Sequence, residues 1–178
     1  QSKDKSSVTP EQVKAIIDTL KLEYDFVLID CPAGIEQGFM NAIAGADEAV
    51  VVTTPEKAAV QDADRIIGML ERSERNIVPK LVINRVRSHM MASGDMLDID
   101  EIMRILSIDL LGLIIDDEEV IAASHRGVPV TMNPDNRAGL GYRNIARRIL
   151  GESVPLLDLN EQPQKGFFVK LKKMLGMK

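Results

Sequence analysis

Few features of this sequence suggest a disulfide framework, a membrane span or a secreted protein. Its 178 residues include a single cysteine, Cys31, which excludes an internal disulfide and is typical of a reducing compartment. No apolar run approaches the ~18–20 residues that a membrane-spanning helix requires, and no signal peptide opens the chain. The sequence does contain 45% hydrophobic residues, enough for one globular domain with a sizeable core. We therefore expect a cytoplasmic protein.

The sequence also lacks a methionine at its start. It begins at Gln1, and its first seven residues are polar and show no periodicity. We interpret this as a sign that the sequence begins inside a larger protein.

Basic residues are concentrated at the C-terminal end. From Pro163 onward there are five lysines and no acidic residue, so this segment carries a charge of +5. The whole chain has a net charge of −5, so the other residues carry −10. At ~100° per residue one arc of a helix over residues 166–178 contains Phe167, Phe168, Leu171, Met174 and Leu175, with lysines beside it. This pattern predicts an amphipathic helix that binds an anionic membrane surface, and a helix packed on its own domain is the alternative. The residues expected at the membrane are Phe167, Phe168, Lys170, Leu171, Lys172, Lys173, Met174 and Leu175.

Strand and helix patterns alternate along the rest of the chain. Short apolar runs predict strands at residues 26–29, 49–52, 81–83 and 110–115. Helical patterns occur at residues 10–22, 56–72, 99–106, 118–124 and 137–150, and Thr9-Pro-Glu-Gln12 has the form of a capping box. This order predicts an α/β fold with a mostly parallel sheet and helices on both faces. We expect an α/β domain over 1–150, a linker over 151–165 and the amphipathic helix over 166–178.

The residues that follow each strand are the candidates for a ligand site, because open α/β sheets bind ligands beyond the carboxyl ends of their strands. Asp30 follows the first apolar run, as in a Walker B motif, and could hold Mg²⁺ directly or through water. Pro32 and Gly34 predict a tight turn whose backbone N–H groups could face phosphate. An Asp30 that only caps a loop is the alternative.

Two further strand ends carry polar side chains. Asn84 and Arg85 follow the third predicted strand, and Asp116 and Asp117 follow the fourth, directly after Ile115. The Asn84 amide and nearby backbone groups, at two adjacent strand ends, could form hydrogen bonds with the edge of an adenine base. The alternative for Asn84 is a turn former.

Together these residues resemble the MinD family of septum-site-determining ATPases, which are deviant-Walker P-loop proteins. The likeness covers nearly the whole chain, and the most specific parts are the segment Asp30-Cys-Pro-Ala-Gly-Ile-Glu36 and the C-terminal tail. It runs through Tyr24–Glu36, Gly45–Asp47, Val51–Pro55, Asp62–Arg65, Asn84–Arg85, Gly94–Met96, Ala123–Ser124, Tyr142–Arg143 and Gly166–Phe167.

The resemblance implies an activity and partners. In the family, ATP and Mg²⁺ join two subunits into a homodimer whose two tails bind the inner membrane surface. The dimer recruits a division inhibitor, and hydrolysis then releases it from the membrane. Topological-regulator proteins are further expected partners. By resemblance, Asp30 is the magnesium-associated aspartate, Asn84 reads adenine with Ile115 to Asp117 alongside, and Asp62, Asp64 and Arg65 contact regulatory partners.

The sequence departs from the family in several places. No G-x-x-x-x-G-K-[ST] occurs, and the resemblance implies that this P-loop lies upstream of Gln1. Without it this chain alone should not hydrolyse ATP, and a sheet without its first strands should expose an apolar edge. Gln61 stands where many relatives have arginine, and Ile115 where they often have proline.

Two other functions remain open from the sequence. The first is a non-enzymatic membrane-docking module, because the chain has an anchor pattern and no P-loop. The second is a related ATPase that partitions chromosomes or plasmids on DNA, although the acidic body argues against nucleic-acid binding.

Overall fold

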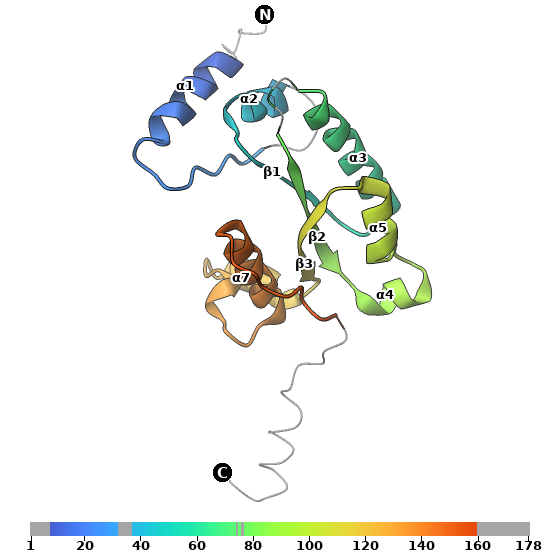
Figure 1. Cartoon of the computed structure of the whole chain (residues 1–178). Coiled ribbons are helices and arrows are strands. Elements are labelled where there is room, and N and C mark those ends of the chain that lie inside the picture. Colours follow the sequence, from blue (N-terminus) through green and yellow to red (C-terminus); the bar gives the residue numbers. More distant parts are fainter. Residues whose placement is uncertain (1–7, 32–36, 74, 76, 160–178) are drawn as a thin grey trace, which may run out of the picture.

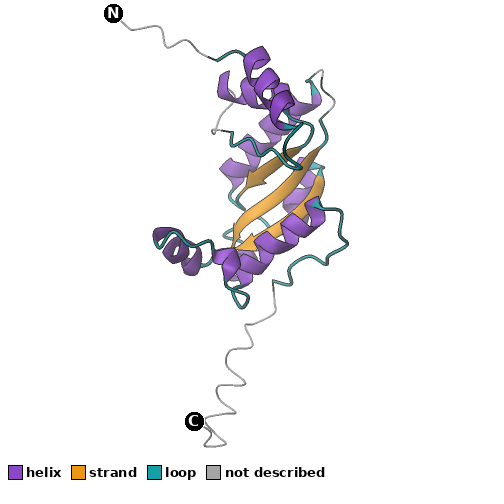
Figure 2. Cartoon of the chain, turned by 90° about the vertical axis from the view of Figure 1, so that its left-hand side faces the viewer, coloured by secondary structure: helices purple, strands orange, loops and turns teal. Residues whose placement is uncertain are grey.

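A computed structural model describes residues 8–31, 37–73, 75 and 77–159. Within them lies a parallel sheet of three strands in the order β1-β2-β3 (Figure 1). The strands are β1 (Ala49–Thr53), β2 (Pro79–Val86) and β3 (Asp109–Ile115). The helices are α1 (Pro10–Leu20), α2 (Gln37–Gly45), α3 (Lys57–Glu71), α4 (Ser88–Ser93), α5 (Ile99–Leu106), α6 (Glu118–His125), the 3-10 turn η1 (Val130–Met132) and α7 (Arg137–Ile149). The predicted fold class is confirmed: helices cover both faces of the sheet (Figure 2).

One face of the sheet carries the larger core. Helices α3 and α5 pack there through apolar residues spaced by three and four positions, the spacing that puts them on one helix face. The buried members of this core are Phe39, Val51, Val60, Ala63, Ile67, Leu70, Leu81, Ile83, Val86, Ile102, Leu106 and Leu113.

Helix α7 covers the opposite face and approaches β3 very closely. A Cβ on Gly112 would lie 2.4 Å from Ile145 Cγ1, and a Cβ on Gly141 would lie 2.7 Å from the Leu113 carbonyl oxygen. Only glycine fits both positions, because real Cβ atoms do not approach other heavy atoms so closely. The smaller core on this face contains Val82, Leu111, Ile114 and Ala138.

Two bulges interrupt the pairing of β2 with β3. Leu81 aligns with Leu110 and Val82 with Gly112, so Leu111 is an extra residue on β3. Farther along, Ile83 aligns with Leu113 and Val86 with Ile115, so β2 has two residues where β3 has only Ile114. The second bulge therefore restores the register that the first one shifts.

Arginine side chains of α7 hold the segment that follows the helix. Arg148 donates to the carbonyl oxygens of Leu111 (2.8 Å), Val154 (3.0 Å) and Pro155 (2.6 Å), and burial lowers its pKa from the usual value. Leu111 is the extra residue of the first bulge. Residues 151–159, which we call the strap, are thus attached to the body, and their Leu157 is buried. The remainder of the predicted linker and the predicted tail helix lie outside the described residues.

Most predicted elements agree with the structure, and the capping box is present. The Thr9 hydroxyl accepts from the Gln12 N–H at 3.3 Å, and the Gln12 side chain accepts from the Thr9 N–H at 3.0 Å. The first helix ends at Leu20 rather than near Leu22. Among the residues described, no helix is both long and apolar enough to cross a membrane.

The strand predicted at residues 26–29 is wrong. That segment is extended but is not part of the sheet, and Phe26 and Leu28 are exposed. An apolar run forms a buried strand only where neighbouring strands accept its backbone hydrogen bonds, and the described residues supply none here. The short helices α2 and α4 were not predicted.

Candidate functional site

The carboxyl ends of β2 and β3 form one pocket of about 160 Å³ with the start of α6 and one side of α7. Every residue predicted at these two strand ends lines it. The lining residues are Asn84, Arg85, Ile114, Ile115, Asp116, Asp117, Val120, Ile121 and Tyr142. The walls are mainly apolar with a few polar groups at the mouth, the usual make-up of a small-molecule site.

The second bulge determines how Asn84 is presented. Arg85 has a left-handed backbone with φ of 57°, uncommon for a residue with a side chain, and its N–H donates to Asn84 Oδ1 at 2.9 Å. Past the bulge, the Asp116 N–H donates to the Val86 carbonyl at 3.0 Å and the ladder resumes. The bulge thus places the Asn84 side-chain amide at the pocket, between two parts of β2 that are paired with β3.

Asp116 joins two arginines at the edge of the pocket. Its carboxylate lies 2.5 Å from Arg87 Nε and 3.7 Å from Arg85 Nε. The Asp116 side chain is half-buried, whereas both guanidinium groups are largely exposed. The cluster therefore ties the end of β3 to the end of β2.

Asp117 is occupied by structural hydrogen bonds. One carboxylate oxygen accepts from the Glu119 N–H at 2.8 Å and so caps α6, and the other accepts from Asn136 Nδ2 at 2.8 Å. Asn136 is buried and in turn caps α7 by accepting from the Gly139 N–H at 2.7 Å. These two capping residues fix the start of α6 relative to the start of α7, so Asp117 shapes the pocket wall.

Asp30 does not line this pocket. It lies at the end of the extended segment and is exposed, as is Cys31 beside it. Desolvation and the neighbouring Asp30 charge raise the pKa of the Cys31 thiol. Pro32 and Gly34 lie outside the described residues. Throughout the described part of the chain, no three His, Cys, Asp or Glu side chains are close enough to hold a metal ion.

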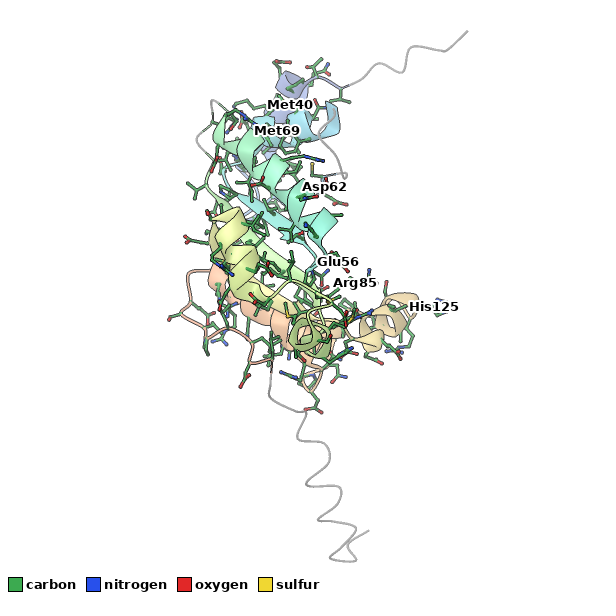
Figure 3. All side chains as sticks on the ribbon, turned by 90° about the vertical axis from the view of Figure 1, so that its right-hand side faces the viewer. Met40, Glu56, Asp62, Met69, Arg85 and His125 are labelled. Atoms are coloured by element: carbon green, nitrogen blue, oxygen red, sulfur yellow. The ribbon has the colours of Figure 1, made fainter. Side chains whose placement is uncertain are left out.

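The predicted partner surface lies on the exposed side of α3. Asp62, Asp64 and Arg65 are all exposed, and Arg65 Nη1 lies 2.9 Å from Asp62 Oδ1. Figure 3 shows Asp62 on this helix, well separated from His125 on α6. These residues are available for a protein contact and are not part of the pocket.

Sequence reasoning missed several contributors to the site, including the apolar lining residues Ile114, Val120 and Ile121. Asn136 directly precedes a helix and could have been recognised as an N-cap, but its bond to Asp117 joins positions 19 residues apart. Arg87 and Tyr142 carry no local signal, because their roles depend on the bulge and on the packing of α7.

Several residues here fit an adenine nucleotide. Ile115 and Tyr142 line the pocket together with Asn84, so the predicted adenine site has apolar side chains for a base and an amide for its edge. The described residues include no cradle for phosphates, so the fit extends to the base only.

Comparison with known proteins gives a consistent result. Residues 3–83 match the family model described as an AAA domain. The septum site-determining protein MinD of Bacillus subtilis (strain 168) is 60% identical over 178 residues, covering all of this chain and 66% of that protein. The chain thus spans slightly less than two thirds of the length of this curated relative.

Two solved structures are similar to this fold. The MinC:MinD cell division protein complex of Aquifex aeolicus matches with a TM-score of 0.80 and 34% identity, covering 85% of this chain and 62% of that chain. The septum site-determining protein MinD of Pyrococcus horikoshii OT3, complexed with Mg-ADP, matches with a TM-score of 0.68 and 25% identity, covering 79% and 56%.

Proposed function

This chain belongs to the MinD family of septum site-determining proteins, and on that premise we propose that it forms the larger part of an ATPase that positions the cell-division septum. The whole-length identity of 60% to the Bacillus subtilis relative is the observation that carries the proposal. The pocket at the ends of β2 and β3 would bind the adenine of ATP. Asp30 would act on Mg²⁺, through water, once a P-loop segment supplies the phosphate cradle.

The partners follow from the same premise. The relative from Aquifex aeolicus is found in a complex with MinC, so we propose a MinC-type division inhibitor as a partner of this protein. The exposed Asp62, Asp64 and Arg65 of α3 are the surface we assign to regulatory proteins. A homodimer that forms with ATP and binds the cytoplasmic face of the membrane completes the proposal.

The tail supports reversible membrane binding. Each lysine near an anionic surface contributes ~1 kcal/mol, so the tail of one subunit should bind weakly. Two tails on one dimer should bind more tightly by ~10²–10⁴-fold through avidity. A weak tail is therefore what a dimerisation switch needs.

The arginines of α7 make the DNA-partition alternative less favourable. Arg143 donates to the carbonyl oxygens of Thr131 (2.7 Å), Asn133 (3.1 Å) and Pro134 (3.0 Å), and Arg148 holds the strap. Arg147 pairs with Glu152 at 2.7 Å. These side chains are engaged within the protein and form no free basic face.

The test uses the chain with a P-loop segment of the family placed before Gln1, which we call the P-loop-joined protein. Co-sedimentation with phosphatidylglycerol vesicles should be stronger with ATP than with ADP, and phosphatidylcholine vesicles should bind little. Phe167→Glu should abolish binding because it puts a charge on the apolar arc. Val169→Glu, on the opposite side of the same helical pattern, is the matched control and should weaken binding less.

Equal binding with ATP and ADP would contradict the switch. If the chain without the P-loop segment also bound vesicles to the same extent, the non-enzymatic docking module would be the better description.

A further inference from the structure

The loop between α6 and α7, residues 126–136, presents apolar side chains to solvent, and we call it the η1 loop. Its Val128 and Met132 are 50% and 73% exposed, on either side of the buried Val130. We propose that Val128 and Met132 form a second membrane contact, which enters an anionic lipid surface beside the tail. This inference rests on the proposed function, because it assumes that the tail binds lipid.

The backbone of the η1 loop is fixed on the start of α7. Arg143 of α7 donates to the carbonyl oxygens of three loop residues at 2.7, 3.1 and 3.0 Å. A Cβ on Gly139, in the first turn of α7, would lie 2.6 Å from the Val130 carbonyl oxygen, so loop and helix are in direct contact. Because Val130 is buried in this contact, Val128 and Met132 remain on the outside.

The strap brings the end of the described chain to the same place. Arg148, near the end of α7, donates to the Val154 carbonyl oxygen at 3.0 Å. Arg137, at the start of α7, donates to the Asp158 carbonyl oxygen. The strap therefore runs back along α7, and its last residues lie at the helix end on which the η1 loop also packs.

The sequence limits how far the tail can lie from this point. Residues 160–165 separate the strap from the predicted amphipathic helix, and an extended segment of this length spans at most roughly 20 Å. A tail bound in the lipid interface therefore keeps the start of α7 close to the same surface. A contact that is too weak to bind alone becomes effective at this range, because the tether raises its local concentration.

The chemistry of the η1 loop fits lipid. Exposed apolar side chains that lie together often mark an interaction site, and a few of them on a rigid turn can enter the acyl boundary without a complementary groove. The loop carries one basic and one acidic residue, Arg126 and Asp135, so its charge does not oppose an anionic surface. Figure 3 shows His125, the last residue of α6, at the periphery of the molecule, where a flat surface can approach.

The experiment makes use of the lack of tryptophan in this sequence. In the P-loop-joined protein, with a joined segment that also lacks tryptophan, Met132→Trp puts a single indole on the η1 loop. Val78→Trp is the matched control, because Val78 is 66% exposed and directly precedes β2, at the opposite end of the sheet. With ATP, phosphatidylglycerol vesicles should shift the emission of Met132→Trp to shorter wavelength, and brominated acyl chains should quench it by about twofold. The emission of Val78→Trp should not change.

A second pair of variants measures the contribution of the contact to binding. Met132→Glu should weaken co-sedimentation with the vesicles by roughly fivefold, because a charge replaces an apolar side chain at the lipid surface. Val78→Glu adds the same charge away from the η1 loop and should stay within about twofold of the starting protein. Both side chains are exposed, so neither change should unfold the protein.

The two measurements separate this inference from the proposed function. If the protein sediments with vesicles in response to ATP but the emission of Met132→Trp does not change, the inference is overturned and the proposed function stands. Emission typical of a buried indole before vesicles are added would also overturn the inference, because protein would then cover the η1 loop. If the protein does not bind vesicles at all, the proposed function fails and the inference fails with it.

Discussion

The two edges of the sheet are built in opposite ways. At β3, α7 packs closely on one face of the strand, and Arg148 donates to the carbonyl oxygen of Leu111, the extra residue of the first bulge. In β1, the side chains of Val50 and Val52 are 44% and 60% exposed. Among the described residues, β1 pairs with β2 on one side and with no strand on the other. The edge strand β3 is packed on both faces and held by specific hydrogen bonds, whereas the edge strand β1 depends on burial of a single face. Substitutions should therefore have large effects near β3 and small ones at β1.

The largest effect is expected from Arg148→Met, which keeps the length of the side chain and removes the donors to three carbonyl oxygens. Hydrogen bonds from a charged donor contribute about 1.5–3 kcal/mol each, and partial exposure reduces the total, so we expect a loss of ~3 kcal/mol in the free energy of unfolding. Urea titration followed by circular dichroism measures it. Arg147→Met removes only an exposed ion pair with Glu152 and should cost less than ~1 kcal/mol. Equal losses would show that the three hydrogen bonds of Arg148 add no more stability than one exposed ion pair.

A smaller effect is expected from Gly141→Ala, which tests the close approach of α7 to β3. The new Cβ would lie 2.7 Å from the Leu113 carbonyl oxygen, and backbone cannot give way as a side chain can. We expect a loss of ~2 kcal/mol in the free energy of unfolding, because the helix must move away from the sheet. The control is Gly68→Ala in α3, where the Cβ meets only the flexible end of Arg72 at 3.3 Å. That change should be neutral or stabilise by about 0.5–1 kcal/mol, and a loss similar to that of Gly141→Ala would argue against specific packing at β3.

The smallest change in stability is expected from Val52→Thr at the β1 edge. The side chain is exposed and threonine retains the β-branched shape, so the free energy of unfolding should change by less than ~0.5 kcal/mol. Self-association, followed by light scattering at increasing concentration, should fall because the edge becomes less apolar. A loss of stability comparable to that of Gly141→Ala would mean that this edge is covered after all.

Much of the fold was predictable because strands and helices have different apolar periods. The three strands and helices α3, α5, α6 and α7 were placed within a few residues of their observed bounds. Residues 26–29 show the limit of this reasoning. Their apolar run has the composition of a buried strand, but composition does not supply the neighbouring backbone that a strand requires.

The site divides in the same manner. Parallel strands bring their carboxyl ends together, so the meeting of Asn84 with Asp116 could be predicted from strand order alone. The left-handed Arg85 could not be predicted, because neither glycine nor proline marks the position and the bulge arises from pairing with β3. Asn136 illustrates a mixed case, since its capping role is local and its bond to Asp117 is not.

The paired bulges of β2 and β3 have a consequence for how this sequence can change. The first bulge adds one residue to β3, which is Leu111. The second adds one residue to β2, where Asn84 and Arg85 lie opposite Ile114 alone, so the two shifts in register cancel. Loss of Leu111 alone would turn every later side chain of β3 to the opposite face, exchanging the residues that contact α3 and α5 with those that contact α7. Length variation in homologous sequences should therefore occur at both places together or at neither.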